Sequence, residues 1–123
     1  MHETMHGALT AVTDDTFAAT VLAADRPVVV DFWADWCPPC RAISRSLTEL
    51  ADEFAGRMLF TTVDTDENPE VTRTYAVLSL PTLLVFRDGA VVASVVGARP
   101  KHHLRQSLAR YLVTDFTVVP GTA

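Results

Sequence analysis

Residues 28–41 read VVVDFWADWCPPCR, an apolar run that begins with three valines and leads into two closely spaced cysteines. The run shows no regular alternation of polar and apolar residues, which is typical of a central β-strand covered on both faces. Beyond the cysteines the apolar residues recur every three or four positions, which is the period of a helix. We therefore predict a buried strand at 28–33 that passes into a long helix at 38–54.

Similar signals place the other elements. Asn68-Pro69 predicts a helix start, with an N-cap followed by proline at the first helical position. Thr13-Asp14-Asp15 supplies an N-cap and acidic first-turn residues for a helix that carries Phe17 and Val21, and Asp88-Gly89 is typical of a tight hairpin turn. The expected strands are residues 8–12, 28–33, 58–63, 82–86 and 90–96, and the expected helices lie after residue 13, at 38–54, at 69–75 and from Pro100 onward. Because parallel strands need helical crossovers and hairpin strands are antiparallel, we predict an α/β fold with a mixed five-stranded sheet flanked by four helices.

Length and charge exclude several classes of protein. The chain has 123 residues, enough for one domain, and its formal net charge of -5 does not suit a partner such as nucleic acid or an anionic membrane. No apolar stretch approaches the roughly 20 residues of a transmembrane helix. Because residues 1–7 lack the features of a secretory signal, we expect a cytoplasmic protein. We expect a monomer, with a flexible tail at 1–7, a domain at 8–112 and a C-terminal extension at 113–123.

Cys37 and Cys40 stand three residues apart at the start of the predicted long helix. At that spacing two side chains share one helical face with Cβ atoms about 5–6 Å apart, so a small adjustment brings them to disulfide distance. The helix dipole favours a thiolate at Cys37, and Arg41 adds a positive neighbour. Such a thiolate attacks a substrate disulfide, and Cys40 then resolves the mixed disulfide. The pair therefore predicts reversible redox chemistry.

Two structural interpretations compete with this one. A zinc site needs four ligands, and His102 and His103 complete a set with the two cysteines only if the last helix folds onto the motif. An inert disulfide or a pair of unused buried thiols is the other alternative, but closing so short a loop stabilises a fold little. We favour redox chemistry and expect no bound metal.

Four segments resemble the thioredoxin family, and they occur in the family's order. They are residues 30–41 (VDFWADWCPPCR), 63–69 (VDTDENP), 80–83 (LPTL) and 96–98 (VGA). The resemblance extends over roughly residues 9–112. It implies a thioredoxin fold and reversible dithiol–disulfide exchange with disulfide-containing protein substrates. It also implies that no cofactor is bound and that electrons come from NADPH through a flavoprotein, thioredoxin reductase.

The resemblance also assigns roles to individual residues. Cys37 matches the attacking cysteine, Cys40 the resolving cysteine, and Asp31 the buried carboxylate that assists proton transfer from the resolving thiol. An aspartate inside an apolar strand is costly unless it is paired or protonated, and its raised proton affinity suits a general base. The alternative is a carboxylate that is simply hydrogen-bonded to the backbone. Pro81 matches a cis-proline that faces the cysteines, and the expected substrate surface comprises Trp36, Pro38, Pro39, Leu80, Pro81, Gly97 and Ala98.

Some residues depart from the family's pattern, and two of them bear on the redox chemistry. Pro38 stands where glycine is usual, and Thr62 stands where many members place a lysine near the buried aspartate. Without that cation Asp31 should be harder to ionise, although the Thr62 hydroxyl could donate a hydrogen bond to it. The two prolines leave a Cys37 thiolate fewer amide donors and stiffen the loop, and both effects favour a stronger reductant.

The predicted function is that of a thioredoxin-type protein-disulfide reductase. One alternative is a thiol carrier dedicated to a single pathway, as in cytochrome maturation, where several carriers have proline after the first cysteine. The other alternative is a non-catalytic interaction module that binds partners through Trp36 and the surrounding surface.

Overall fold

The computed structural model describes residues 9–112 of the chain. The expected tail at 1–7 and the expected extension at 113–123 lie outside the described residues. The strands are β1 (Leu9–Ala11), β2 (Val28–Trp33), β3 (Leu59–Asp64), β4 (Thr82–Arg87) and β5 (Ala90–Val96). The helices are η2 (Ala18–Leu22), α1 (Pro38–Glu53), α2 (Pro69–Thr74) and α3 (Lys101–Ala109).

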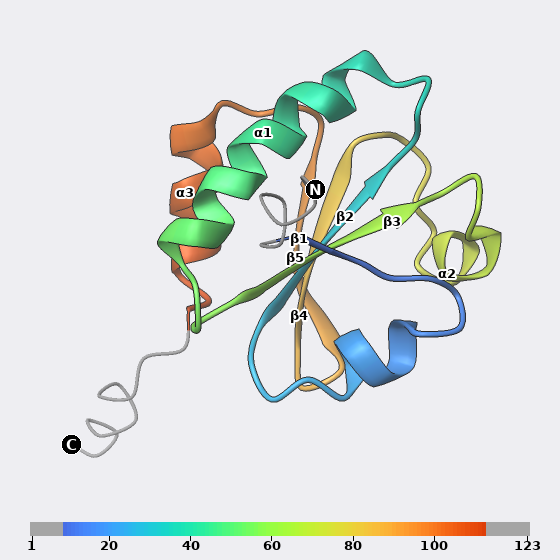
Figure 1. Ribbon diagram of the computed structural model, residues 1–123, viewed down its shortest axis with the longest axis horizontal. Helices are drawn as coiled ribbons and strands as arrows, with labels where there is room; N and C mark the ends of the chain where they lie inside the picture. Colours follow the sequence, from blue (N-terminus) through green and yellow to red (C-terminus); the bar gives the residue numbers. More distant parts are fainter. Residues whose placement is uncertain (1–8, 113–123) are drawn as a thin grey trace, which may run out of the picture.

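The five strands form one mixed sheet in the order β1-β3-β2-β4-β5 (Figure 1). β1 and β2 both run parallel to β3, whereas β4 is antiparallel to β2 and to β5. The hairpin between β4 and β5 turns at Asp88 and Gly89, whose φ angles are 51° and 81°. The predicted fold class, with a mixed five-stranded sheet and four helices, is confirmed.

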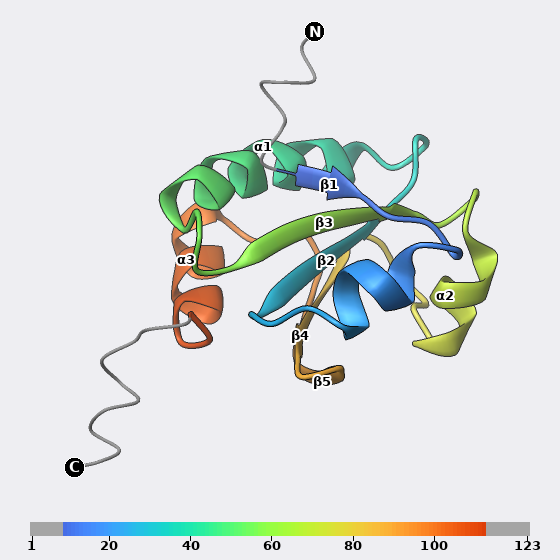
Figure 2. The ribbon, with the colours of Figure 1, turned by 60° about the horizontal axis from the view of Figure 1, so that its bottom comes forward.

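The helices cover the two faces of the sheet in pairs. α1 and α3 pack on one face, and η2 and α2 pack on the other (Figure 2). β2 shows why its sequence lacks alternation, because its residues are buried on both sides. Val28, Val30 and Phe32 belong to the core beneath η2 and α2, and Val29 belongs to the core beneath α1 and α3. Asp31 therefore points to the α1 side of the sheet, as does Val29.

Two local predictions need correction. The helix expected after residue 13 is a five-residue π-helix at Ala18–Leu22 rather than an α-helix. Thr13 does cap the turn before it, since its Oγ1 accepts the N–H of Thr16 at 3.2 Å and its carbonyl accepts that of Phe17 at 2.9 Å. Asn68 occupies the N-cap position of α2, but its side chain does not cap that helix. Asp14 does so instead, since its carboxylate accepts the N–H groups of Glu70 and Val71 at 3.2 and 2.8 Å. The acidic residue assigned to the first helix thus serves a helix that follows much later in the chain.

The long helix α1 ends as its sequence predicts. Its buried face consists of Cys40, Ile43, Leu47, Leu50 and Ala51. Gly56 follows with a φ of +84°, the left-handed conformation that favours glycine after a helix. Within residues 9–112, no helix has the length and apolar character needed to cross a membrane.

Candidate active site

Cys37 and Cys40 form a disulfide at the N-terminus of α1. Cys37 is the N-cap residue, Pro38 and Pro39 fill the first two helical positions, and the Cα atoms of the cysteines lie 5.4 Å apart. Proline fits there because the first N–H groups of a helix have no partner within the helix. The structure therefore brings the two cysteines together at the helix start, as their spacing predicted.

The surroundings of the cysteines bear on the stability of a Cys37 thiolate. Because the two prolines have no N–H, the first amide of the helix is that of Cys40, and it donates to the carbonyl of Cys37 at 3.0 Å. Arg41, expected as a positive neighbour of Cys37, directs its Nη2 to the carbonyl of Asp35 at 3.3 Å. A neutral carbonyl does not cancel the charge of the guanidinium, so Arg41 and the helix dipole both stay predicted sources of thiolate stabilisation at Cys37.

Asp31 and Cys40 line one pocket on the α1 side of the sheet. The pocket has a volume of about 420 Å³, and Leu9, Ala11, Trp33, Arg41, Ser44 and Thr62 complete its lining. The Asp31 side chain is almost completely buried, and its Oδ1 has no hydrogen-bond partner among the described residues. Burial raises the pKa of this carboxyl from 3.8 to about 7. A group with this pKa can accept and release a proton near neutral pH, which is what a general base requires.

The sheet register explains why there is a pocket beside Asp31. Asp31 on β2 lies next to Thr62 on β3, and Thr62 lies next to Ala11 on β1. The small side chains of Ala11 and Thr62 leave space between the sheet and α1. The Thr62 hydroxyl makes no hydrogen bond to Oδ1 of Asp31. Trp33, at the end of β2, is half-buried and lines the same pocket.

Trp36 lies beside the disulfide and is the most exposed tryptophan, with 67% of its surface accessible. Its indole Nε1 donates to Oδ2 of Asp66 at 2.9 Å. Asp66 belongs to the loop between β3 and α2 and was not among the predicted site residues. The segment 63–69 resembles the thioredoxin family, but nothing in the local sequence indicates that one of its three acidic side chains reaches the tryptophan.

The remaining predicted surface residues come from two other loops. The Leu80–Pro81 peptide bond is cis, and the carbonyl of Pro81 accepts the N–H of Gly97 at 2.9 Å. This bond holds the loop at Gly97 and Ala98 against the start of β4. Leu78, which was not predicted to belong to this surface, is 94% exposed and stands two residues before Leu80.

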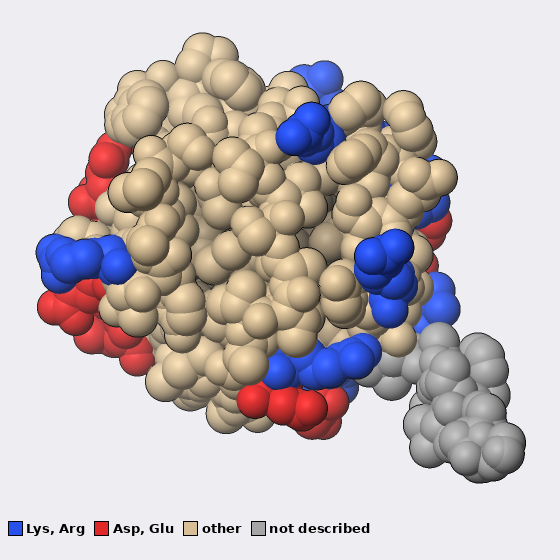
Figure 3. Space-filling model, turned by 180° about the vertical axis from the view of Figure 1, so that it is seen from behind, with Lys and Arg blue, Asp and Glu red and all other residues tan. Residues whose placement is uncertain are grey.

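Charged side chains are sparse on one face of the molecule. Figure 3 shows a broad central surface without Lys, Arg, Asp or Glu, with the charged groups gathered towards its rim. A protein that binds nucleic acid needs a continuous basic surface. This face does not provide one.

The described residues contain no cluster suited to a metal ion. Between Leu9 and Leu112, no group of three or more His, Cys, Asp or Glu side chains is placed so that it could hold one.

Comparisons with known proteins agree with this geometry. Residues 8–110 match the family model described as Thioredoxin. Thioredoxin 1 of Nostoc sp. is 48% identical over 101 residues, which cover 82% of this chain and 94% of the relative. The thioredoxin of Streptomyces clavuligerus is 50% identical over 97 residues, covering 79% and 90%. That of Mycobacterium bovis is 42% identical over 109 residues, covering 89% and 94%.

Proposed function

Because the chain belongs to the thioredoxin family, we propose that Cys37 attacks the disulfides of protein substrates and that Cys40 resolves the resulting mixed disulfide. The protein is a thiol–disulfide oxidoreductase of the reductase type. The observation that carries the assignment of roles is the asymmetry of the pair. Cys37 is the N-cap residue of α1, whereas Cys40 lies inside the helix and shares a pocket with Asp31.

The proposed reaction has two exchange steps. The thiolate of Cys37 attacks one sulfur of the substrate disulfide, an S–S bond to Cys37 forms, and a substrate thiolate leaves. Cys40 then transfers its proton to the Asp31 carboxylate and attacks the sulfur of Cys37, and the second substrate thiolate leaves. The substrate gains two electrons, and the protein is left with the Cys37–Cys40 disulfide. The raised pKa of Asp31, caused by burial, supports its role as the base.

The proposed substrate surface surrounds the disulfide. Trp36, Pro38, Pro39 and Ala98 are exposed, and Leu80 and Gly97 are partly exposed. The buried Pro81 holds Gly97 through its carbonyl. Exposed apolar groups beside a reactive centre favour contact with an unfolded or extended segment of a partner protein. We add Leu78 to this surface because of its exposure and its place in the same loop as Leu80.

The oxidised protein must be reduced again after each turnover. We propose that the electrons come from NADPH through a flavoprotein thioredoxin reductase, that the protein acts as a monomer, and that it works in the cytoplasm. A compartment with a steady supply of NADPH suits a protein that must return to the dithiol state, which supports the cytoplasmic assignment.

Reduction of insulin coupled to NADPH oxidation by a thioredoxin reductase tests these roles together. The wild-type protein should turn over, Cys37→Ser should be inactive, and Cys40→Ser should accumulate a mixed disulfide that mass spectrometry detects at Cys37. A Cys37→Ser variant that still forms the mixed disulfide would reverse the two assignments. Activity with dithiothreitol but none with NADPH and the reductase would leave the cysteine roles intact and refute the proposed electron source.

A further inference from the structure

Asp14 and the N-terminus of α2 are joined by hydrogen bonds that span a large separation in sequence. The Asp14 carboxylate accepts the N–H of Val71 at 2.8 Å and that of Glu70 at 3.2 Å. α2 has no side-chain cap of its own at Asn68. The carboxylate therefore satisfies amide groups that the short helix leaves unpaired.

The side chain of Asn68 also forms a hydrogen bond with Asp14. Its Oδ1 accepts the backbone N–H of Asp14 at 2.9 Å, and its Nδ2 donates to the carbonyl of Asp64 at 3.0 Å. Only 7% of Asn68 is exposed, so these bonds are largely shielded from water. The Asn68 side chain thus ties the segment around Asp14 to both ends of the loop between β3 and α2.

The same loop carries the hydrogen-bond partner of Trp36. Oδ1 of Asp64 accepts the backbone N–H of Asp66 at 3.0 Å and that of Glu67 at 3.4 Å, which fixes the turn of the loop. Oδ2 of Asp66 then accepts the indole N–H of Trp36 at 2.9 Å. A continuous series of hydrogen bonds thereby connects Asp14 with the tryptophan next to Cys37.

We propose that Asp14 is a positioning residue for substrate recognition, because it fixes the loop that holds the indole of Trp36. An indole that is two-thirds exposed has few packing contacts to set its orientation, so its one polar anchor decides where it lies. The series begins at the backbone N–H of Asp14, which alanine keeps. Loss of the carboxylate frees the amides of Glu70 and Val71, so the N-terminus of α2 is no longer held, and the adjoining loop that positions Asp66 loosens with it. The inference rests on the proposed function in one respect, namely that Trp36 contacts protein substrates.

The test compares Asp14→Ala with Asp15→Ala. Both variants remove one carboxylate from adjacent positions of the same turn, so they match in charge, and Asp15 belongs to neither the hydrogen-bond series nor the catalytic groups. For insulin we expect Asp14→Ala to raise KM roughly three- to tenfold, as expected for loss of one hydrogen bond, with kcat unchanged. Reduction of a small aromatic disulfide, which does not need the tryptophan surface, should be unaffected. Asp15→Ala should have the KM of the wild type. Asp14→Asn can still cap a helix, so its KM should lie between those of the wild type and Asp14→Ala.

A structural readout keeps the result independent of activity. In the indole region of an NMR spectrum, assigned with Trp33→Phe, the Trp36 Nε1–H of Asp14→Ala should shift and exchange faster with solvent. An unchanged Trp36 signal together with an unchanged KM would overturn the inference. An equal loss of rate for insulin and for the small disulfide would overturn it too, because it would mean general damage to the fold. Should the wild type fail to reduce insulin at all, the proposed function fails, and the indole signal alone still decides the role of Asp14.

Discussion

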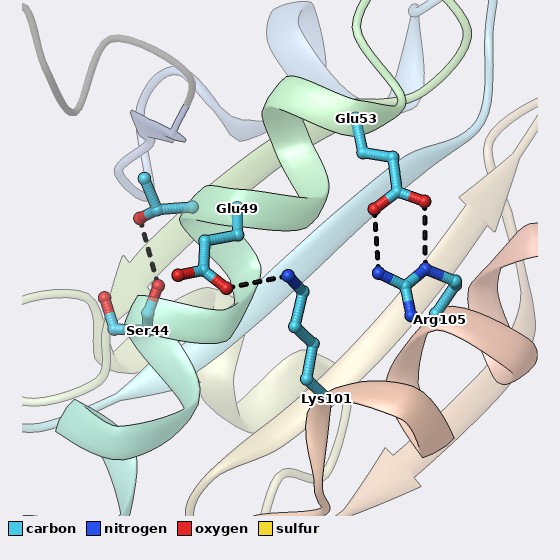
Figure 4. A network of polar contacts seen from close by, with 6 residues as sticks. Ser44, Glu49, Glu53, Lys101 and Arg105 are labelled. Carbon is cyan, nitrogen blue, oxygen red and sulfur yellow. Dashed lines mark hydrogen bonds and ion pairs between the residues drawn. The ribbon is translucent and has the colours of Figure 1, made fainter.

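The guanidinium of Arg105 on α3 donates to both carboxylate oxygens of Glu53 on α1, each at 2.9 Å (Figure 4). Lys101 and Glu49 form a second ion pair one turn earlier on the same two helices, at 2.8 Å. The paired side chains are partly or largely exposed and lie at the margin of the core that α1 and α3 share. They connect the helix that carries the active-site cysteines to the last helix of the domain.

We predict that Arg105→Ala lowers the midpoint of thermal unfolding by a few degrees at most, because exposed ion pairs contribute little in water. The hydrogen bond from Arg105 lowers the pKa of Glu53 below its ordinary 4.5. A carboxyl whose pKa is lowered by folding stabilises the fold above that ordinary value, and its contribution disappears as the pH falls through the lowered pKa. The difference in unfolding midpoint between Arg105→Ala and the wild type should therefore be present at pH 7 and absent at pH 2. Arg99→Ala, which removes the same charge from an exposed position, is the control, and an Arg105 effect that persists in 1 M NaCl would contradict the ion-pair explanation.

The buried Asp31 should affect the pH dependence of stability in the direction opposite to Glu53. Burial raises its pKa from 3.8 to about 7, so between these values the folded protein binds a proton that the unfolded chain does not. Stability should fall as the pH rises from about 4 to about 7, by roughly 4 kcal/mol relative to Asp31→Asn, and should level off above that. Urea unfolding of the oxidised proteins measures the difference, and Asp52→Asn serves as an exposed control. Parallel pH curves for wild type and Asp31→Asn would refute the raised pKa.

The Pro38→Gly variant tests how the two prolines affect the redox potential. Glycine restores an N–H at the first helical position and loosens the loop, so the Cys37 thiolate gains a donor and the disulfide loses rigidity. Both effects stabilise the dithiol, and the potential should become less negative by on the order of 30 mV, the equivalent of one charge-assisted hydrogen bond. Equilibration with glutathione measures the shift. A move towards a more negative potential would show that the prolines do not act in this way.

Gly97 and Gly56 form a matched pair for the role of the loop beside β4. Both have a positive φ, 94° and 84°, and a Cβ on either would meet nothing within 4 Å. Alanine at either position should therefore cost a similar amount, about 1–2 kcal/mol of backbone strain. Only Gly97→Ala should also raise the KM for insulin, because strain at its positive φ would shift the loop whose N–H donates to Pro81 at the proposed substrate surface. Equal KM values for the two variants would argue against that surface.

Local sequence patterns predicted most of the fold for a physical reason. The valines of β2, the apolar stripe of α1 and the Asp88-Gly89 turn each depend on neighbours in sequence, so periodicity and turn chemistry were sufficient. The segment at 13–22 was the exception. Thr13 caps a turn there as its sequence predicts, but Asp14, which is expected to serve the same helix start, caps α2 instead. Such a use cannot be read from neighbouring residues.

Some features of the candidate site could likewise be predicted from the local sequence, and others could not. The cysteine spacing and the buried Asp31 are visible in one short segment, and the resemblance added the cis-proline and the loop at Gly97. Asp66 escaped prediction because its contact with Trp36 joins two loops that only the folded sheet brings together. The hydrogen bond anticipated between Thr62 and Asp31 is not made to Oδ1 of Asp31, although register places the two residues side by side.

The sequence by itself determined that two cysteines stand at the start of a helix behind a buried strand, since both features follow from spacing and hydrophobic period. Only the tertiary structure decided that Asp31 faces a pocket without a partner for one oxygen and that Asp14 is linked to Trp36 through a distant loop. The reason is that strand register and helix packing set which side chains meet across the sheet. Contacts of this kind form only when the whole chain folds, because the residues that make them are far apart in sequence.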